Sequence, residues 1–194
     1  MTLKELVSAS RSCRRFEEDR RIPLAVLEDL VSLVRLCPSA GNLQPLRYVL
    51  STDPGLNEHL FHLLGWAAYL KDWKGPEKGS RPAAYVAICC EGKRGRFVDW
   101  DTGIAAQTLL LGARENGIAG CMIGSFNPKQ VGRLFDLSET ETCCLVLALG
   151  YPKEFPVIEP VGADGGIKYY RDAEGQHHVP KWSMDTLIRA RYGA

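Results

Sequence analysis

The segment 101–116 constrains the fold more than any other, because it has the pattern of a helix with few polar positions to face water. Its apolar side chains fall on most sides of that helix: Ile104, Ala105, Ala106, Leu109, Leu110, Leu111 and Ala113. A helix that is apolar on nearly all sides is buried, either in a domain core or at a subunit interface. Gly117 follows as a C-terminal cap residue would, so we expect the helix to end there.

Helical and strand-like patterns alternate along the rest of the chain. Apolar residues recur at helical spacing from Leu27 to Val34, and Pro23 suits the first turn of that helix. The order of elements predicts a sheet enclosed by helices, and 194 residues suit one domain, residues 1–194. The expected elements are helices at 23–36 and 57–64 and strands at 46–52, 85–90 and 143–149.

Two other segments have a different character. Residues 65–82 place Trp66, Tyr69 and Trp73 among Lys, Gly and Pro, and we expect a lid or pocket wall there. The alternative is a short helix whose aromatic residues pack on the core. After Pro160 the chain is polar and glycine-rich, with a hairpin-like stretch at 168–179. This tail is too polar to add much core, so we expect it to lie on a partner subunit.

Charge and hydropathy exclude several classes of protein. The chain has 24 basic and 23 acidic residues, a net charge of +1, which argues against bulk nucleic-acid binding. No apolar run approaches the roughly 20 residues of a membrane helix, and no stretch of signal-peptide length opens the sequence. We therefore expect a soluble cytoplasmic protein with no membrane association.

The seven cysteines do not form a disulfide or metal pattern. Neighbours on a strand point to opposite faces, so Cys89 with Cys90, and Cys143 with Cys144, are expected to be separate buried side chains. This usage fits a reducing compartment. His59 and His62 have no cysteine or carboxylate cluster beside them, so no metal site is expected.

Two polar segments carry candidate binding chemistry. The first, SRSCRRF at 10–16, holds three arginines and two hydroxyls, and the arginine fork matches phosphate oxygens. Its alternative is a solvated basic face paired with the acidic residues at 17–19. The second, PSAGNLQP at 38–45, offers donors and acceptors for the edge of a planar heterocycle. Its alternative is an ordinary turn between a helix and a strand.

These pieces together resemble the nitroreductase family of FMN-dependent NAD(P)H oxidoreductases, over nearly the whole chain. RSCRRF and PSAGNLQP are similar to two of the family's motifs, DTGIAAQTLLLGARENGIAGCMIGSF is similar to its helix, strand and flavin-contacting turn, and HHVPKW is similar to its C-terminal phosphate site. The resemblance implies an α+β fold with a mixed sheet flanked by helices. It also implies an intertwined homodimer, with the C-terminal tail wrapping the partner and two FMN molecules at the subunit interface.

The resemblance carries site roles to the matching positions. It places Arg11 and Ser12 at the FMN phosphate or ribityl chain, Arg14 near flavin N1 and the C2 carbonyl, and Lys181 back at the phosphate. The remaining implied flavin contacts are Pro38, Ser39, Asn42 and, less directly, Gln44 from the other subunit, and Met122, Ile123, Gly124 and Ser125 beside the ring, with the Gly124 N–H directed at N5.

The implied chemistry belongs to the cofactor, so no catalytic residue is assigned. NADH or NADPH would deliver hydride to flavin N5, and a nitroaromatic, a quinone or free flavin would then accept the electrons. Trp66, Tyr69 and Trp73 would form the pocket wall above the ring. Ser10 and Trp182 stand where many family members have cations, which implies weaker FMN binding unless Arg15 replaces one of them.

Two other functions remain open from the sequence. The first is an FMN-binding protein of the same fold with a non-catalytic or sensory role, which the missing cations make conceivable. The second is a cofactor-free thiol enzyme that uses Cys13 or Cys121, because a thiolate beside Arg14 and Arg15 would have a lowered pKa.

Overall fold

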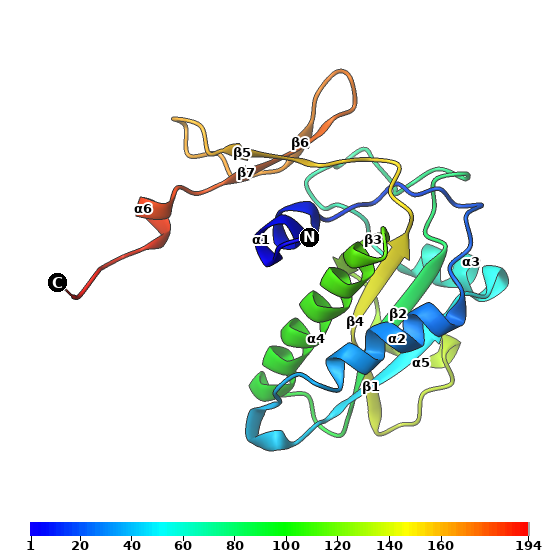
Figure 1. Ribbon diagram of the computed structural model, residues 1–194. Coiled ribbons are helices and arrows are strands. Elements are labelled where there is room, and N and C mark those ends of the chain that lie inside the picture. The colour runs from blue at the N-terminus through cyan, green and yellow to red at the C-terminus, as the bar shows by residue number, and fades with distance from the viewer. Residues whose placement is uncertain (194) are drawn as a thin grey trace.

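A four-stranded antiparallel sheet between two layers of helices forms the body of the computed structural model, which describes residues 1–193 (Figure 1). The elements are α1 (Leu3–Ala9), α2 (Leu24–Val34), η1 (Ala40–Asn42), β1 (Leu46–Ser51), α3 (Pro54–Leu63), β2 (Ala84–Glu91), α4 (Arg96–Glu115), β3 (Ala119–Ile123), α5 (Pro128–Leu134), β4 (Glu141–Gly150), β5 (Val157–Pro160), β6 (Tyr170–Arg171), β7 (His177–Lys181) and α6 (Met184–Leu187).

The two faces of the sheet carry two separate apolar cores. The strand order is β1-β2-β4-β3, so β2 and β4 are central and β3 is an edge strand. Val86, Ile88 and Leu147 pack with α2 and α4, whereas the alternate residues Tyr85 and Val146 pack in the cluster on the opposite face. This alternation follows from the period of two in a strand, and it places helices on both sides, as the sequence predicts. The expected α+β fold is confirmed.

The predicted elements are present, with shifted ends. The helix expected at 101–116 begins earlier, at Arg96, because Gly95 provides its N-cap and Asp99 lies in its first turn. Two elements outside the predicted set, α1 and α5, are only seven residues each. Both have side-chain N-caps, from Thr2 and Asn127, which stabilise helices too short to show a clear periodicity.

The helix α4 is buried along one side only. Ala105, Leu109 and Ala113 are buried, but Trp100 is 55% exposed and Ile104 is 39% exposed. The apolar sequence of α4 is therefore not fully covered by this chain. The domain core, the first of the two burial modes that the sequence predicts, therefore covers one side of α4, and the other side is open in this chain.

The adjacent cysteines point to opposite faces of the sheet, as predicted. Cys89 and Cys143 are register partners on β2 and β4 and share one core cluster, whereas Cys90 and Cys144 lie in another. All seven cysteines are free thiols, and six of them are buried.

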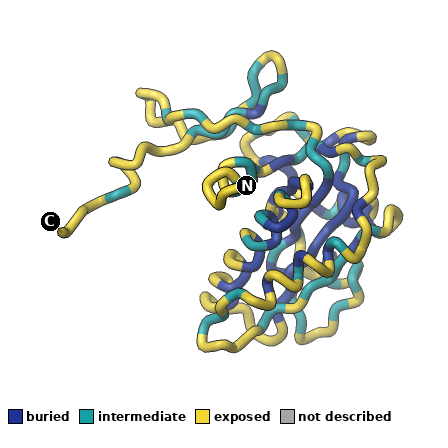
Figure 2. The backbone as a smooth tube through the Cα atoms, in the orientation of Figure 1, coloured by how far each residue is buried: buried dark blue, intermediate teal, exposed yellow. Residues whose placement is uncertain are grey.

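The tail forms a small sheet outside the body, with strand order β5-β7-β6. The predicted hairpin is confirmed: β6 and β7 are antiparallel, and Gly175 adopts φ 80° in the turn between them. Beyond β7 the chain runs away from the body and is mostly exposed (Figures 1 and 2). Among residues 1–193, no helix has the length and apolar character needed to cross a membrane.

Gly120 on β3 sets how closely β3 packs against β4 and α4. A Cβ there would lie 2.5 Å from the Ala148 carbonyl oxygen and 2.6 Å from the Leu149 side chain. We expect Gly120→Ala to lower the free energy of unfolding by about 3 kcal/mol, as overpacking does, in urea denaturation. The control Gly132→Ala, whose Cβ would be 3.8 Å from Leu137, should leave that free energy unchanged or slightly higher. Equal destabilisation by both substitutions would contradict this packing.

Candidate functional site

The arginine-rich segment lies along the edge strand β3. Ser12 forms a bridge with Gly120, and the Cys13 N–H donates to the Gly120 carbonyl at 3.0 Å. Farther along, the Phe16 N–H donates to the Ser80 carbonyl at 2.9 Å. The segment is thus held between β3 and the end of the 65–80 loop, and its arginines are fixed at the sheet edge.

Arg11 is positioned by the end of α1. Its Nη2 donates to the Val7 carbonyl at 2.8 Å, and burial lowers the pKa of its guanidinium. Its Nε is buried and finds no partner within residues 1–193. A buried guanidinium N–H without an acceptor is costly, and an anion beside it would relieve that cost. The Ser12 residue beside it is exposed.

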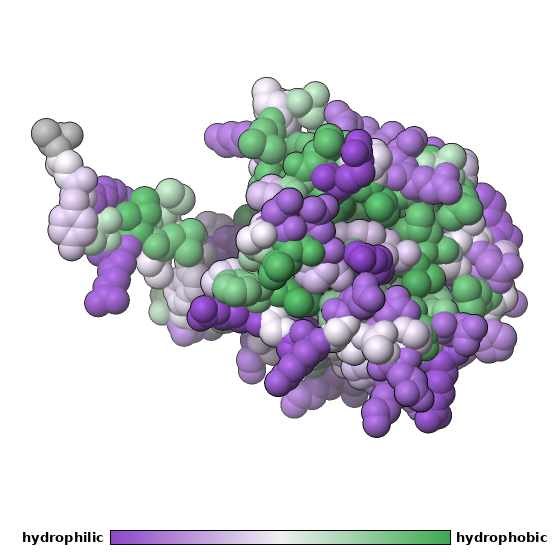
Figure 3. Space-filling model, turned by 90° about the horizontal axis from the view of Figure 1, so that it is seen from below, coloured by the Kyte–Doolittle hydropathy of each residue, from purple (hydrophilic) through white to green (hydrophobic). Residues whose placement is uncertain are grey.

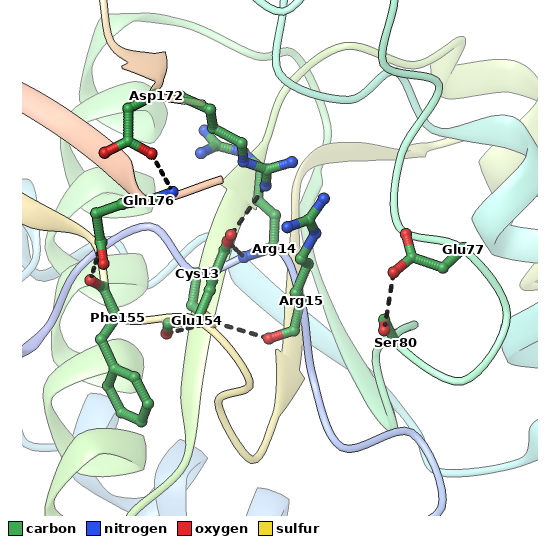
Figure 4. Close-up of polar contacts among 10 residues, drawn as sticks. Cys13, Arg14, Arg15, Glu77, Ser80, Glu154, Phe155, Asp172 and Gln176 are labelled. Atoms are coloured by element: carbon green, nitrogen blue, oxygen red, sulfur yellow. Dashed lines mark hydrogen bonds and ion pairs between the residues drawn. The ribbon is translucent and has the colours of Figure 1, made fainter. Parts of the chain in front are cut away.

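Arg14 is held by a buried carboxylate. The Arg14 N–H donates to Glu154 Oε1 at 2.6 Å, and Arg171 Nη2 donates to Glu154 Oε2 at 2.9 Å. The Arg171 and Glu154 side chains are only 12% and 8% exposed. The Arg14 guanidinium lies 5.2 Å from the centre of the Tyr169 ring. Figure 4 shows Glu154 at the centre of these contacts, with Arg14 and Arg15 extending from the neighbouring segment.

The turn that follows β3 lies beside the base of the 65–80 loop. Met122, Gly124 and Ser125 are exposed, whereas the Ile123 side chain is buried in the core. The Gly65 N–H donates to the Ser125 carbonyl at 2.7 Å. Because Ser12 pairs with Gly120 on β3, the arginine segment and the turn at the end of that strand lie along the same sheet edge.

The PSAGNLQP turn is fixed by Asp101 at the other end of α4. The Ser39 Oγ donates to Asp101 Oδ2 at 2.5 Å, and the Ala40 N–H donates to Oδ1 at 3.1 Å. Gln44 donates from its backbone N–H to the Ser39 Oγ and from Nε2 to the Asn42 side chain. A cavity of about 440 Å³ opens here, lined in part by Pro38, Ser39, Gln44, Tyr48 and Ile104.

The structure does not bring the two polar segments together within one chain. Asp101 lies near the start of α4, and β3 follows its end, so the helix separates them by about 20 Å at 1.5 Å per residue. Lys181 lies exposed on β7, where its carbonyl accepts from the Val161 N–H. Within the part of the chain that the structure describes, Lys181 makes no hydrogen bond or ion pair with the arginine segment.

The three aromatic residues of the predicted pocket wall have different environments. Trp66 lies in the core, 9% exposed and 5.3 Å from the Phe61 ring, so core packing describes it better than a pocket wall. Tyr69 and Trp73 do line an open groove between the loop and the tail. The Tyr69 ring lies 4.9 Å from Tyr169.

The thiol alternative is not supported, because burial outweighs the nearby cations. Cys13 is 1% exposed, and burial followed by the Glu154 charge raises its pKa to about 12. Cys121 is fully buried, and burial raises its pKa to about 12 although Arg14 opposes this. Neither thiol is a thiolate at neutral pH, so the expected lowered pKa is wrong.

Comparison with known proteins assigns the chain to a family. The model of the nitroreductase family matches residues 7–151. The chain belongs to the nitroreductase family. It is 23% identical over 181 residues to the oxygen-insensitive NADPH nitroreductase of Helicobacter pylori, covering 76% of this chain and 86% of that one. It is 24% identical over 175 residues to the NADPH-flavin oxidoreductase of Vibrio harveyi, covering 80% and 68%.

A solved structure shows the same fold. The nitroreductase family protein of Streptococcus pneumoniae superimposes with a TM-score of 0.69 at 16% identity, covering 98% of this chain and 100% of that one. This match covers nearly the whole chain and therefore includes most of the tail.

Several residues that shape the site were missed by sequence reasoning. Glu154 and Arg171 form a buried pair between segments that are 17 residues apart, and no local pattern marks it. Tyr169 belongs to the tail, and its ring lies beside the Arg14 guanidinium only because the tail folds back to the arginine segment. Asp101 is the exception, because it opens the DTGIAAQ motif and is the first residue of the predicted helix. The motif predicts the helix, but it does not predict the hydrogen bond that Ser39 donates to Asp101.

The pKa of His177, at the start of β7, reports how the tail packs on this site. It is 1% exposed, and burial followed by the Arg14 and Arg171 charges lowers its pKa to about 4, against the opposing pull of Glu154. In the unfolded chain the pKa of this histidine is near 6.5, so between about pH 4 and pH 6.5 the unfolded state binds more protons than the folded state. We therefore expect the free energy of unfolding to fall as pH is lowered from about 6.5 to about 4.

Urea denaturation at pH 7 and pH 5 tests this in three proteins. His177→Gln should remove much of the loss between the two pH values. The exposed control His59→Gln should keep the loss seen in the unsubstituted protein. An unchanged pH dependence in His177→Gln would show that His177 is not buried in neutral form.

Proposed function

We propose that this nitroreductase-family protein is an FMN-dependent oxidoreductase that uses NADH or NADPH to reduce a small acceptor such as a nitroaromatic or a quinone. The family assignment supports it, as do the similarity to the NADPH-flavin oxidoreductase of Vibrio harveyi and the structural similarity to an FMN-dependent nitroreductase of Clostridium difficile. The observation that carries it is the arginine segment, which is fixed along β3 and in which the buried Nε atoms of Arg11 and Arg15 have no hydrogen-bond partner within residues 1–193.

The residues of that segment fit FMN chemically. The buried, unpartnered Nε of Arg11 and the exposed Ser12 suit a phosphate or ribityl oxygen. Within the described residues, the Arg14 guanidinium forms no ion pair with a carboxylate. It lies 5.2 Å from the centre of the Tyr169 ring. A cation held in this way suits the electron-rich edge of a flavin.

The turn after β3 supplies the complementary surface. Met122 offers an exposed apolar side chain, while Gly124 and Ser125 expose backbone. Ile123 holds the turn in place from the core, so we assign it a backbone role only. When bound, FMN would supply hydride transfer from the nicotinamide to the acceptor. The chain itself would bind the cofactor, orient the reactants and exclude water. These roles need no acid or base residue.

The cofactor site is proposed to need two copies of the chain. Because α4 keeps Ser39, Asn42 and Gln44 apart from Arg11 within one chain, a homodimer is required to place both groups on one FMN. Exposed apolar residues support such an interface, and Figure 3 shows apolar groups on the body and on the extended tail. These residues include Leu36, Leu43, Phe97, Trp100, Ile104, Trp182, Met184 and Leu187.

The tail is proposed to wrap the partner subunit. It leaves the body with Trp182, Met184 and Leu187 exposed, and contiguous exposed apolar surface of this kind marks an interaction site. Lys181 would then reach the cofactor phosphate of the site that the partner completes. The whole chain, residues 1–194, acts as one domain in this proposal.

An absorption spectrum without oxygen tests the proposed function. We expect the purified protein to show flavin bands near roughly 370 and 450 nm that bleach on addition of NADH or NADPH. The nicotinamide that bleaches them faster identifies the donor. Bound flavin that neither nicotinamide reduces would leave a flavin-binding role only, and failure to take up added FMN would contradict the proposal altogether.

Substitution of Arg11 tests the phosphate contact separately from turnover. We expect Arg11→Gln to raise the Kd for FMN about tenfold or more, the equivalent of about 1.4 kcal/mol for a charge-assisted hydrogen bond. Fluorescence quenching of FMN titrated with apoprotein measures it. The exposed control Arg133→Gln on α5 should bind FMN as the unsubstituted protein does.

A further inference from the structure

An open groove of about 550 Å³ lies between the loop that follows α3 and the tail sheet. Its volume is in the range of small-molecule sites. None of its residues is assigned to hold FMN, and the groove has both aromatic and charged walls. It is lined by Tyr69, Leu70, Lys71, Asp72, Trp73 and Arg171.

The loop connects the two parts of the proposed flavin site. At one end, the Gly65 N–H donates to the Ser125 carbonyl at 2.7 Å; at the other, the Ser80 carbonyl accepts from the Phe16 N–H at 2.9 Å. A Cβ at Gly65 would lie 2.5 Å from the Ser125 Oγ, so the loop begins in tight contact with that turn. The groove adjoins the proposed cofactor site through Glu154, because this carboxylate accepts from Arg171 of the groove wall and from the backbone of Arg14.

The groove walls are held rigid by stacking and by a buried ion pair. The Arg171 guanidinium lies 4.4 Å from the centre of the Trp73 ring, and its Nη2 is bound to Glu154. The Tyr69 ring packs on Tyr169, whose hydroxyl accepts from the Tyr69 N–H at 3.4 Å. Two aromatic side chains and one guanidinium fork are thus fixed on one groove, an arrangement that binds a ring with an attached anion.

The charged residues that line the groove are two cations, Lys71 and Arg171, and one carboxylate, Asp72. Glu154 is engaged by Arg171 and by the Arg14 backbone, so it does not balance the other guanidiniums. Burial, and then Arg15 and Arg14, lower the pKa of Arg171, against the opposing pull of Glu154. His177, with a pKa of about 4, adds no charge at neutral pH. Lys168 adds a cation beside the lining, with its Nζ 5.9 Å from the centre of the Tyr69 ring.

We propose that this groove binds the electron acceptor, and that the acceptor is a planar aromatic anion whose ring lies against Trp73 and Tyr69 and whose acidic group is held by Arg171. The proposal rests on the proposed function, because the groove matters for reduction only if flavin occupies the neighbouring site. It narrows the acceptor from any small oxidant to an aromatic carboxylate or a compound of similar charge.

A pair of matched ligands tests it on the FMN-loaded protein. 4-Nitrobenzoate and 4-nitrobenzamide share a ring and a nitro group and differ in charge. We expect calorimetric titration of the oxidised protein to give a Kd at least tenfold lower for the acid, and steady-state kinetics to give a kcat/KM ratio of similar size. Raising the salt concentration should reduce this ratio.

Three variants and one control locate the effect. Arg171→Gln should reduce the preference for the acid to less than about threefold. Since this leaves Glu154 without its ion pair, the double variant Glu154→Gln with Arg171→Gln repeats the measurement without a buried unpaired charge. Trp73→Leu should weaken both ligands and keep their ratio. The control Lys78→Gln, an exposed lysine of the same loop outside the groove lining, should keep the full preference.

The outcomes separate this inference from the function on which it rests. Reduction of bound flavin by NAD(P)H with equal affinity for the two ligands would overturn the groove inference and leave the proposed function standing. Selective binding of the acid by a protein that NAD(P)H does not reduce would overturn the proposed function and support the anion site. A raised KM for NADH or NADPH in Arg171→Gln, with an unchanged ligand ratio, would assign Arg171 to the nicotinamide phosphates and overturn the inference.

Discussion

The buried carboxylate of Glu154 is the contact on which the arrangement of the site depends. One of its oxygens accepts from the backbone of Arg14 and the other from the guanidinium of Arg171. It therefore joins the end of β4, the arginine segment and the tail sheet at one point. Leaving one member of such a buried pair without its partner costs about 3–5 kcal/mol, so the three segments are held as a unit. Arg14, Tyr169 and the groove beside Trp73 all take their positions from it.

A second constraint is the length of α4. The helix has 20 residues, which keeps the Ser39–Asp101 network at one end and the Gly120 contact of the arginine segment at the other. In the proposed homodimer, one chain would therefore contribute one half-site to each of the two cofactor sites. The exposed Trp100 and Ile104 along the same helix give those halves an apolar surface on which to meet. In this account the interface and the cofactor site are built by the same helix.

The sequence predicted those helices and strands whose own residues form a periodic or continuous apolar pattern. The periodic apolar residues of α2 and the continuous apolar runs of β2 and β4 determine which side chains face the core, and these were confirmed. The motifs located the arginine segment and the turn after β3. The sequence could not show contacts between residues that are far apart along the chain. These are the Glu154–Arg171 pair, the packing of Tyr169 on Tyr69, and the burial that makes Cys13 unreactive. Those depend on distances between distant segments, which no local pattern encodes.

The central claim, that each FMN site takes residues from two chains, is tested most directly by mixing two defective variants. Arg11→Gln impairs one half-site, and Asn42→Gly impairs the other while tolerating the positive φ of 53° at that position. If the halves come from different chains, a purified heterodimer of the two variants has one intact site, and we expect one tightly bound FMN per heterodimer. If each site lies within one chain, both sites of the heterodimer carry a defect, and the absence of a tight site would contradict the account.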